Sequence, residues 1–94
     1  MWIESIAVIG AGTMGHGIAQ VAAAAGFRVL LNDVDRESLA RGVAAIDSNL
    51  VKGIQRGKLT EDDRDRTLQQ IRGTTNLKEC AAADLIIEAA PEQL

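Results

Sequence analysis

Three glycines spaced as Gly-x-Gly-x-x-Gly constrain this chain more than any other feature of its sequence: Gly10, Gly12 and Gly15. They follow a short apolar run at residues 6–9, which reads as a buried strand bounded by glycine. Apolar residues then recur at helical spacing until Gly26, which is placed to end a helix. A second short apolar run follows at residues 27–33. Strand, helix and strand in this order predict a βαβ unit with a right-handed crossover.

The rest of the chain predicts two further strands and three further helices. A long amphipathic helix has Asp35 as its N-cap and ends near Gly57. A capping box then opens a second, very polar surface helix. The residues of these remaining elements are the capping box 60–63, the strands 71–75 and 84–90, and one or two helical turns at 76–82. This order predicts an α/β fold, a truncated Rossmann-type doubly wound parallel sheet of about four strands in the order 3-2-1-4.

The composition argues against several classes of function. The 94 residues carry ten Lys and Arg against thirteen Asp and Glu, a net charge of −3, and no basic run. We therefore expect no nucleic acid partner and no polybasic membrane anchor. No apolar run reaches the roughly 18 residues of a membrane span. The lone Cys80 fits a small buried residue in a reducing, cytoplasmic compartment, and no Cys and His residues have metal-site spacing.

The glycine motif predicts a dinucleotide-binding loop, because it directly follows a strand and opens a helix. Gly10 permits the tight turn, Gly12 lets the backbone approach a pyrophosphate, and Gly15 allows close packing of helix on strand. Free N–H groups and the positive end of the helix then favour phosphates. The alternative is an ordinary glycine turn followed by an aspartate that caps a helix.

Asp33 adds a prediction about which dinucleotide binds. It lies at the carboxyl end of the second strand, eighteen residues after Gly15. A carboxylate there accepts hydrogen bonds from both hydroxyls of the adenosine ribose. The same charge repels the 2′-phosphate of NADP, and the nearest basic residue beyond it is Arg36. We therefore expect NAD rather than NADP.

Other side chains carry weaker expectations. His16 lies in the first turn of the phosphate-binding helix. We expect it at the edge of the cofactor site or in solvent, without a catalytic role. Glu92 lies just beyond the carboxyl end of the last strand, where ligands of such folds bind, with a plain surface carboxylate as the alternative. Trp2 is expected to cap the core or a subunit contact.

Together these features resemble the NAD-binding domain of the 3-hydroxyacyl-CoA dehydrogenases, including the bacterial 3-hydroxybutyryl-CoA dehydrogenases. The resemblance spans essentially the whole chain and is carried by residues 6–20, 30–33, 53–60 and 83–92. It implies that residues 1–94 are the N-terminal part of an NAD-binding Rossmann domain. The remaining strands and a helical substrate and dimerisation domain would be absent. The cofactor-binding residues it implies are Gly10, Ala11, Gly12, Thr13, Met14 and Gly15 in the loop, Asp33 at the ribose, and Ala89 and Glu92 approaching the cofactor.

The family reaction passes hydride between NAD and the 3-carbon of a 3-hydroxyacyl-CoA in fatty acid metabolism and beta-oxidation. Its histidine and glutamate pair comes from later strands, and no residue of these 94 matches that histidine. The resemblance therefore implies a parent oxidoreductase whose segment binds NAD without turnover and carries no catalytic residue. Acyl-CoA would bind only the full-length protein. Asn49 stands where the family often has a serine, on helices that carry some acyl-CoA contacts.

The sequence leaves two other functions open. One is a stand-alone, non-catalytic NAD-binding or sensing module, and the other is a structural remnant whose sheet edge pairs with another chain. The chain stops where another helix would begin, which favours a piece of a longer protein. The parent is expected to be a homodimer. The open edge of the last strand is a predicted site of self-association.

Overall fold

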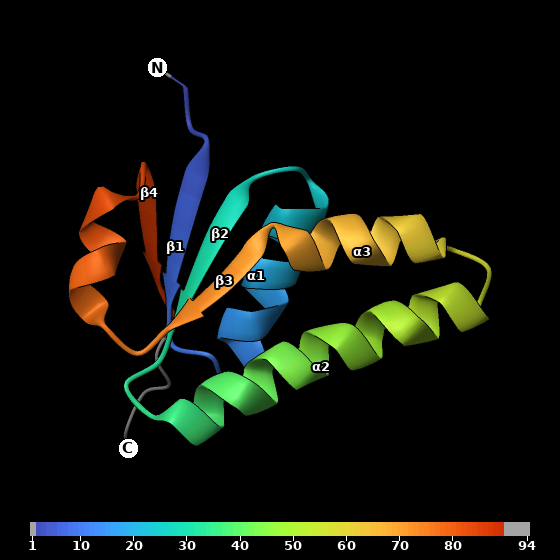
Figure 1. The fold of residues 1–94 in the computed structure, drawn as a ribbon, viewed down its shortest axis with the longest axis horizontal. Helices are drawn as coiled ribbons and strands as arrows, with labels where there is room; N and C mark the ends of the chain where they lie inside the picture. The colour runs from blue at the N-terminus through green and yellow to red at the C-terminus, as the bar shows by residue number, and fades with distance from the viewer. Residues whose placement is uncertain (1, 90–94) are drawn as a thin grey trace.

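The computed structural model describes residues 2–89 and forms one parallel sheet with helices on both sides (Figure 1). The strands are β1 (Ser5–Ile9), β2 (Arg28–Asn32), β3 (Ile71–Thr74) and β4 (Leu85–Glu88), in the spatial order β3-β2-β1-β4. The helices are α1 (Thr13–Ala24), α2 (Arg36–Gln55), α3 (Glu61–Gln69) and the 3₁₀ helix η1 (Leu77–Ala82). The predicted α/β class, the doubly wound parallel sheet and the order 3-2-1-4 are confirmed.

The direction of the crossovers places the helices. The right-handed connection from β1 to β2 puts α1 on one face of the sheet, where α2 and α3 join it. The connection from β3 to β4 runs the opposite way across β2 and β1, so it puts η1 on the other face. Figure 1 shows α2 and α3 on one side of the strands and η1 on the other.

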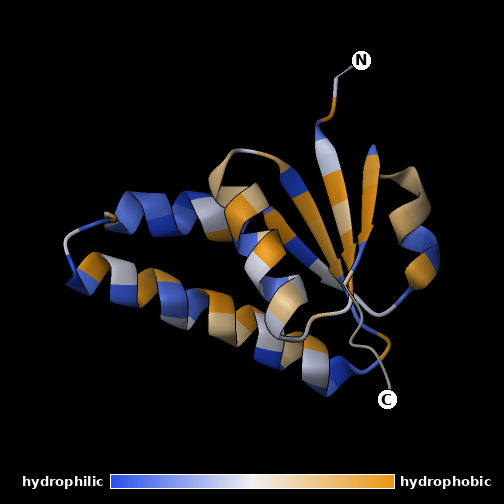
Figure 2. Cartoon of the chain, turned by 180° about the vertical axis from the view of Figure 1, so that it is seen from behind, coloured by the Kyte–Doolittle hydropathy of each residue, from blue (hydrophilic) through white to orange (hydrophobic). Residues whose placement is uncertain are grey.

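The apolar core lies between the sheet and the helices α1 and α2. Alternate residues of β1 and β2 point toward α1 and α2, as a pleated strand requires. They join α2 in one buried cluster that includes Ile6, Val8, Val29, Leu31, Ile46 and Leu50. Burying a side chain of this size contributes about 1.5–3 kcal/mol. Figure 2 shows largely apolar strands and a largely polar α3, the surface helix that the sequence predicted.

The helix ends follow the predicted signals. The Asp35 carboxylate accepts a backbone N–H in the first turn of α2. Thr60 and Asp63 form the capping box of α3. Gly26 and Gly57 follow the ends of α1 and α2 with positive φ angles of 101° and 73°, which favour glycine. These stops are local, so the sequence alone locates them.

Two details differ from the sequence predictions, at the ends of two strands and at Trp2, and a third, at Thr67, is one that the sequence did not predict. The observed β2 and β4 are shorter than the strands predicted at 27–33 and 84–90. The buried residue of α3 is Thr67, whose hydroxyl donates to the Asp63 carbonyl one turn earlier. Trp2 is 88% exposed and therefore does not cap the core of this chain.

The structure also bears on the lone cysteine, on membrane spans and on metal sites. Cys80 of η1 is buried as expected, and burial raises the pKa of its thiol. None of the helices described between residues 2 and 89 is both long and apolar enough to span a bilayer. Over the same residues, no three His, Cys, Asp or Glu side chains are grouped so that they could hold a metal ion.

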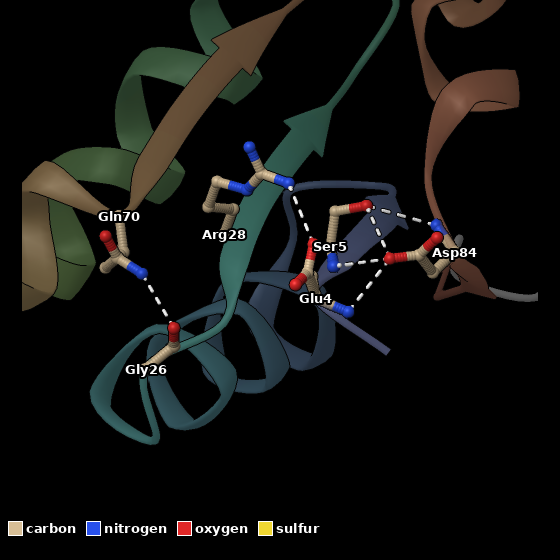
Figure 3. Close-up of polar contacts among 6 residues, drawn as sticks. All are labelled: Glu4, Ser5, Gly26, Arg28, Gln70 and Asp84. Carbon is tan, nitrogen blue, oxygen red and sulfur yellow. Dashed lines mark hydrogen bonds and ion pairs between the residues drawn. The ribbon is translucent and has the colours of Figure 1, made fainter. Parts of the chain in front are cut away.

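Asp84 fastens the start of β4 to the start of β1 (Figure 3). Its Oδ2 accepts the backbone N–H groups of Glu4 at 2.8 Å and Ser5 at 3.1 Å, and the Ser5 hydroxyl at 3.3 Å. Its own N–H donates to the Ser5 carbonyl at 3.1 Å. The backbone donors of Glu4 and Ser5 favour the charged carboxylate and hold the pKa of Asp84 below its ordinary value.

We expect Asp84→Asn to destabilise the chain at neutral pH and to matter less in acid. Folding lowers the pKa of this carboxyl, so its contribution is present above the unfolded pKa and is lost as pH falls through the folded pKa. Thermal unfolding near pH 7 and near pH 3 should show the larger difference from the unmutated chain near pH 7. Asp65→Asn on α3 is the control, and an equal difference for Asp84→Asn at both pH values would contradict the assignment.

Candidate functional site

The glycine loop joins β1 to α1 at the carboxyl end of the sheet. Gly10 has a φ of 102°, a conformation that L side chains rarely adopt, and its N–H donates to the Asn32 carbonyl at 2.7 Å. Gly15 lies so close to Gly10 that an added Cβ would sit 1.6 Å from the Gly10 carbonyl oxygen. The tight turn and the close helix packing predicted for these two glycines are therefore present.

Gly12 faces open space. A Cβ added there would meet nothing within 4 Å. It is the N-cap of α1, with no side-chain capping bond and no acidic residue in the first turn. In contrast, the other described helices have side-chain caps from Asp35, Thr60 and Asn76. The first-turn N–H groups of α1 are therefore left for an external acceptor, and the helix dipole favours an anionic one such as a pyrophosphate.

Asp33 lies at the end of β2 and is fixed to the glycine loop. Its Oδ2 accepts the Ala11 N–H at 3.0 Å, and its Oδ1 accepts the Asp35 N–H at 3.0 Å. The residue predicted to bind the ribose thus also holds the loop, which sequence reasoning missed. Each carboxylate oxygen has a second lone pair, so both can still accept a hydroxyl.

A pocket of about 380 Å³ joins the loop, Asp33 and α2. Among the predicted site residues, its lining includes Ala11, Gly12, Thr13 and Asp33. Sequence reasoning missed four residues on one face of α2 that also line it: Ser38, Arg41, Gly42 and Ala45. Their spacing matches one helical face, but only the packing of α2 on the loop shows that this face points inward.

His16 lines the same pocket, as expected for a residue at the edge of a cofactor site. Its Nδ1 atom is buried and finds no hydrogen-bond partner among residues 2–89.

Four of the described predicted site residues are not in the lining of that pocket: Gly10, Met14, Gly15 and Ala89. Met14 is 67% exposed and lines an apolar depression on the outer side of α1. Ala89 follows β4, is 6% exposed, and donates its N–H to the Ile9 carbonyl at 2.8 Å. Its Cβ would be 3.7 Å from a Cβ added at Gly15, so it lies beside the loop. Glu92 falls outside the described residues.

A larger pocket of about 580 Å³ lies between α1 and α3, with Gln20, Leu59 and Gln70 in its lining. Its wall includes Gly26, two residues before β2, and Gln70, directly before β3, so this pocket lies toward the amino end of the sheet. Ligands of open α/β sheets bind outside the carboxyl ends of the strands. The smaller pocket at Asp33 is therefore the candidate site.

The strand order, the uncapped glycine loop and the carboxylate after β2 define a dinucleotide-binding Rossmann domain. Residues 5–94 match the family described as "3-hydroxyacyl-CoA dehydrogenase, NAD binding domain". The chain belongs to this family of NAD-binding domains. The resemblance seen in the sequence and the choice of NAD as cofactor are thereby confirmed.

Individual relatives agree with the family. The chain is 48% identical over 92 residues to 3-hydroxyadipyl-CoA dehydrogenase from Escherichia coli (strain K12), covering 98% of this chain and 19% of that one. It is 44% identical over 91 residues to 3-hydroxybutyryl-CoA dehydrogenase from Bradyrhizobium diazoefficiens, covering 97% and 31%. A crystal structure of 3-hydroxybutyryl-CoA dehydrogenase from Escherichia coli K12 superposes with a TM-score of 0.93 at 46% identity, covering 99% and 20%. The chain thus spans less than a third of each of these relatives.

We expect Gly12→Ala and Gly15→Ala to separate binding from folding. The alanine at position 12 has room, so unfolding free energy should change by less than about 1 kcal/mol, while the methyl group obstructs the pyrophosphate and weakens NAD binding. The alanine at position 15 overlaps the Gly10 carbonyl and should cost about 1–3 kcal/mol or more. Urea unfolding and NAD titration of both variants measure the two effects. A Gly15→Ala chain as stable as Gly12→Ala would contradict the packing role.

Proposed function

We propose that residues 1–94 are the N-terminal part of the NAD-binding domain of a 3-hydroxyacyl-CoA dehydrogenase. The proposed NAD contacts are Gly10, Ala11, Gly12, Thr13, Met14, Gly15, Asp33, Ala89 and Glu92. One observation carries the proposal: the uncapped amino end of α1 and the fixed carboxylate of Asp33 border the same pocket. A pyrophosphate and an adenosine ribose need those two groups side by side.

The residues of this chain bind and orient the cofactor. First-turn N–H groups of α1 donate to the pyrophosphate, and Gly12 leaves room for it. Asp33 accepts the ribose hydroxyls. Because the N–H groups of Ala11 and Asp35 hold its carboxylate in place, the negative charge cannot easily move away from the 2′-phosphate of NADP and repels it. Bound NAD supplies the capacity to accept or give hydride. This arrangement favours NAD over NADP.

The parent activity that we propose is hydride transfer between NAD and the 3-position of a 3-hydroxyacyl-CoA. The names of the relatives support it, because both are dehydrogenases of 3-hydroxyacyl-CoA compounds. The alternative, a stand-alone NAD-binding module, gives no reason for this similarity to dehydrogenases. A general base must lie within hydrogen-bond reach of the substrate hydroxyl. We assign no residue of this chain that role, so the chain alone should bind NAD without turnover.

Other partners remain proposals. Acyl-CoA is proposed as substrate of the whole protein, and Asn49, at the family's frequent serine position, donates its amide to Gln20 at 3.3 Å. A homodimer is proposed for the parent. Self-association of this chain is proposed along the outer edge of β4, where Leu85 and Ile86 are 40% and 48% exposed. The cytoplasmic location stays a prediction from the sequence.

We expect Asp33→Ala to weaken NAD binding by roughly tenfold or more, because hydrogen bonds to a charged group are lost. Affinity for NADP should fall less or rise, because the repulsion of its 2′-phosphate is removed. Calorimetric titration of each purified chain with NAD and with NADP measures both changes.

Asp62→Ala is the control, since this exposed carboxylate lies on α3 away from the pocket. Thermal unfolding of Asp33→Ala separates a lost ribose contact from a displaced loop, because Asp33 also binds the Ala11 N–H. Equal affinity of the unmutated chain for NAD and NADP would refute the ribose assignment.

A further inference from the structure

We propose that Arg41 is a second specificity-determining residue of the cofactor pocket, and that its guanidinium faces the 2′-phosphate position beside Asp33. Sequence order alone makes Arg36 the nearest basic residue after Asp33. The proposal rests on the proposed NAD-binding function. It assigns to the Arg41 side chain the affinity for NADP that the pocket keeps despite the repulsion between Asp33 and the 2′-phosphate.

Arg41 is held at the rim of the pocket that also contains Asp33. Its Nη2 donates to the Ser38 hydroxyl at 3.1 Å, and that hydroxyl donates to the Asp35 carboxylate at 2.6 Å. This chain of contacts ties the guanidinium to the amino-terminal turns of α2. The side chain is therefore anchored next to the β2–α2 connection, where the 2′-hydroxyl of a bound ribose would lie.

The face of α2 that carries Arg41 is turned toward the glycine loop by close packing. At Gly42, an added Cβ would lie 2.6 Å from the Ala11 carbonyl oxygen, so the α2 backbone touches the loop there. Ala45, one turn further on, lines the same pocket. This contact fixes the rotation of α2 and thereby places Arg41 on the pocket side.

Arg36 lies on a different side of α2. It is the first residue of the helix, and five residues of an α-helix correspond to a rotation of roughly 140°. Arg36 is exposed and is absent from the residues that line the pocket. The two arginines have equal charge on one helix, so Arg36 is a matched control for Arg41.

The charged groups around Arg41 leave it able to bind a phosphate. Oε2 of Glu37 lies 4.0 Å from Nη1 of Arg41. Asp35 is linked to the Arg41 guanidinium through the Ser38 hydroxyl. Asp33 borders the same pocket. The Arg41 side chain is 70% exposed and a guanidinium has five N–H donors, so donors remain for phosphate oxygens. Asp33 repels a 2′-phosphate and Arg41 attracts it, so the two together determine how strongly the pocket separates NAD from NADP.

The test is a set of single and double variants of the 94-residue chain: Arg41→Ala, Arg36→Ala, Asp33→Ala, Asp33→Ala with Arg41→Ala, and Asp33→Ala with Arg36→Ala. Each is titrated calorimetrically with NAD and with NADP after thermal unfolding confirms that it folds. Arg41→Ala should weaken NADP binding about fivefold, in either background, and change NAD binding less than about twofold. Arg36→Ala should change neither.

The outcomes separate this inference from the function on which it rests. If the folded, unmutated chain binds neither dinucleotide, the proposed function falls and the Arg41 assignment falls with it. If the chain binds NAD but Arg41→Ala and Arg36→Ala behave alike toward NADP, only the Arg41 assignment is overturned. If Arg41→Ala weakens NAD and NADP equally, Arg41 contacts a group that both cofactors share, which also overturns it.

Discussion

The contact of α1 with the end of β1 is the constraint on which the rest of the site depends. A side chain at Gly15 would overlap the Gly10 carbonyl, so glycine alone lets the helix begin directly against the sheet. A second close contact, of Gly42 with the Ala11 carbonyl, brings α2 onto the same loop. Two helices therefore converge on one short stretch of backbone. The pocket between them is a consequence of that packing.

The carboxylate after β2 links the loop to its proposed ligand. Asp33 binds the Ala11 N–H, so this donor is committed within the protein, while the first-turn donors of α1 stay open. The bond also fixes the carboxylate beside the pocket. Under the proposed function the same carboxylate would hold the loop and accept the ribose hydroxyls, which would couple the shape of the site to its preference for NAD.

The two ends of the sheet are built differently. At the amino end, Asp84 uses backbone donors from β1 to close the junction with β4, and the Gln70 amide donates to the Gly26 carbonyl (Figure 3). At the carboxyl end, the N-cap residue of α1 is Gly12, which provides no side-chain cap. In the other described helices a side-chain cap accepts a hydrogen bond from a first-turn N–H group. In α1 these N–H groups have no such cap and are available to an anion at the carboxyl end of the sheet.

The sequence by itself determined the features that depend on local interactions. These are the places of the strands and helices along the chain, the helix caps at Asp35 and Thr60, and the tight turn at Gly10, because hydrophobic spacing and backbone sterics act over a few residues. The strand order followed from the succession of these elements, because parallel strands joined by right-handed crossovers allow few topologies. The tertiary structure alone decided which face of α2 meets the pocket. As a result, Arg41 lines the pocket and Arg36 does not. It also decided the bond from Ala11 to Asp33. The first depends on how α2 rotates against a loop some thirty residues earlier, and the second on the parallel pairing of β1 with β2, which brings their ends together. No local pattern encodes either arrangement.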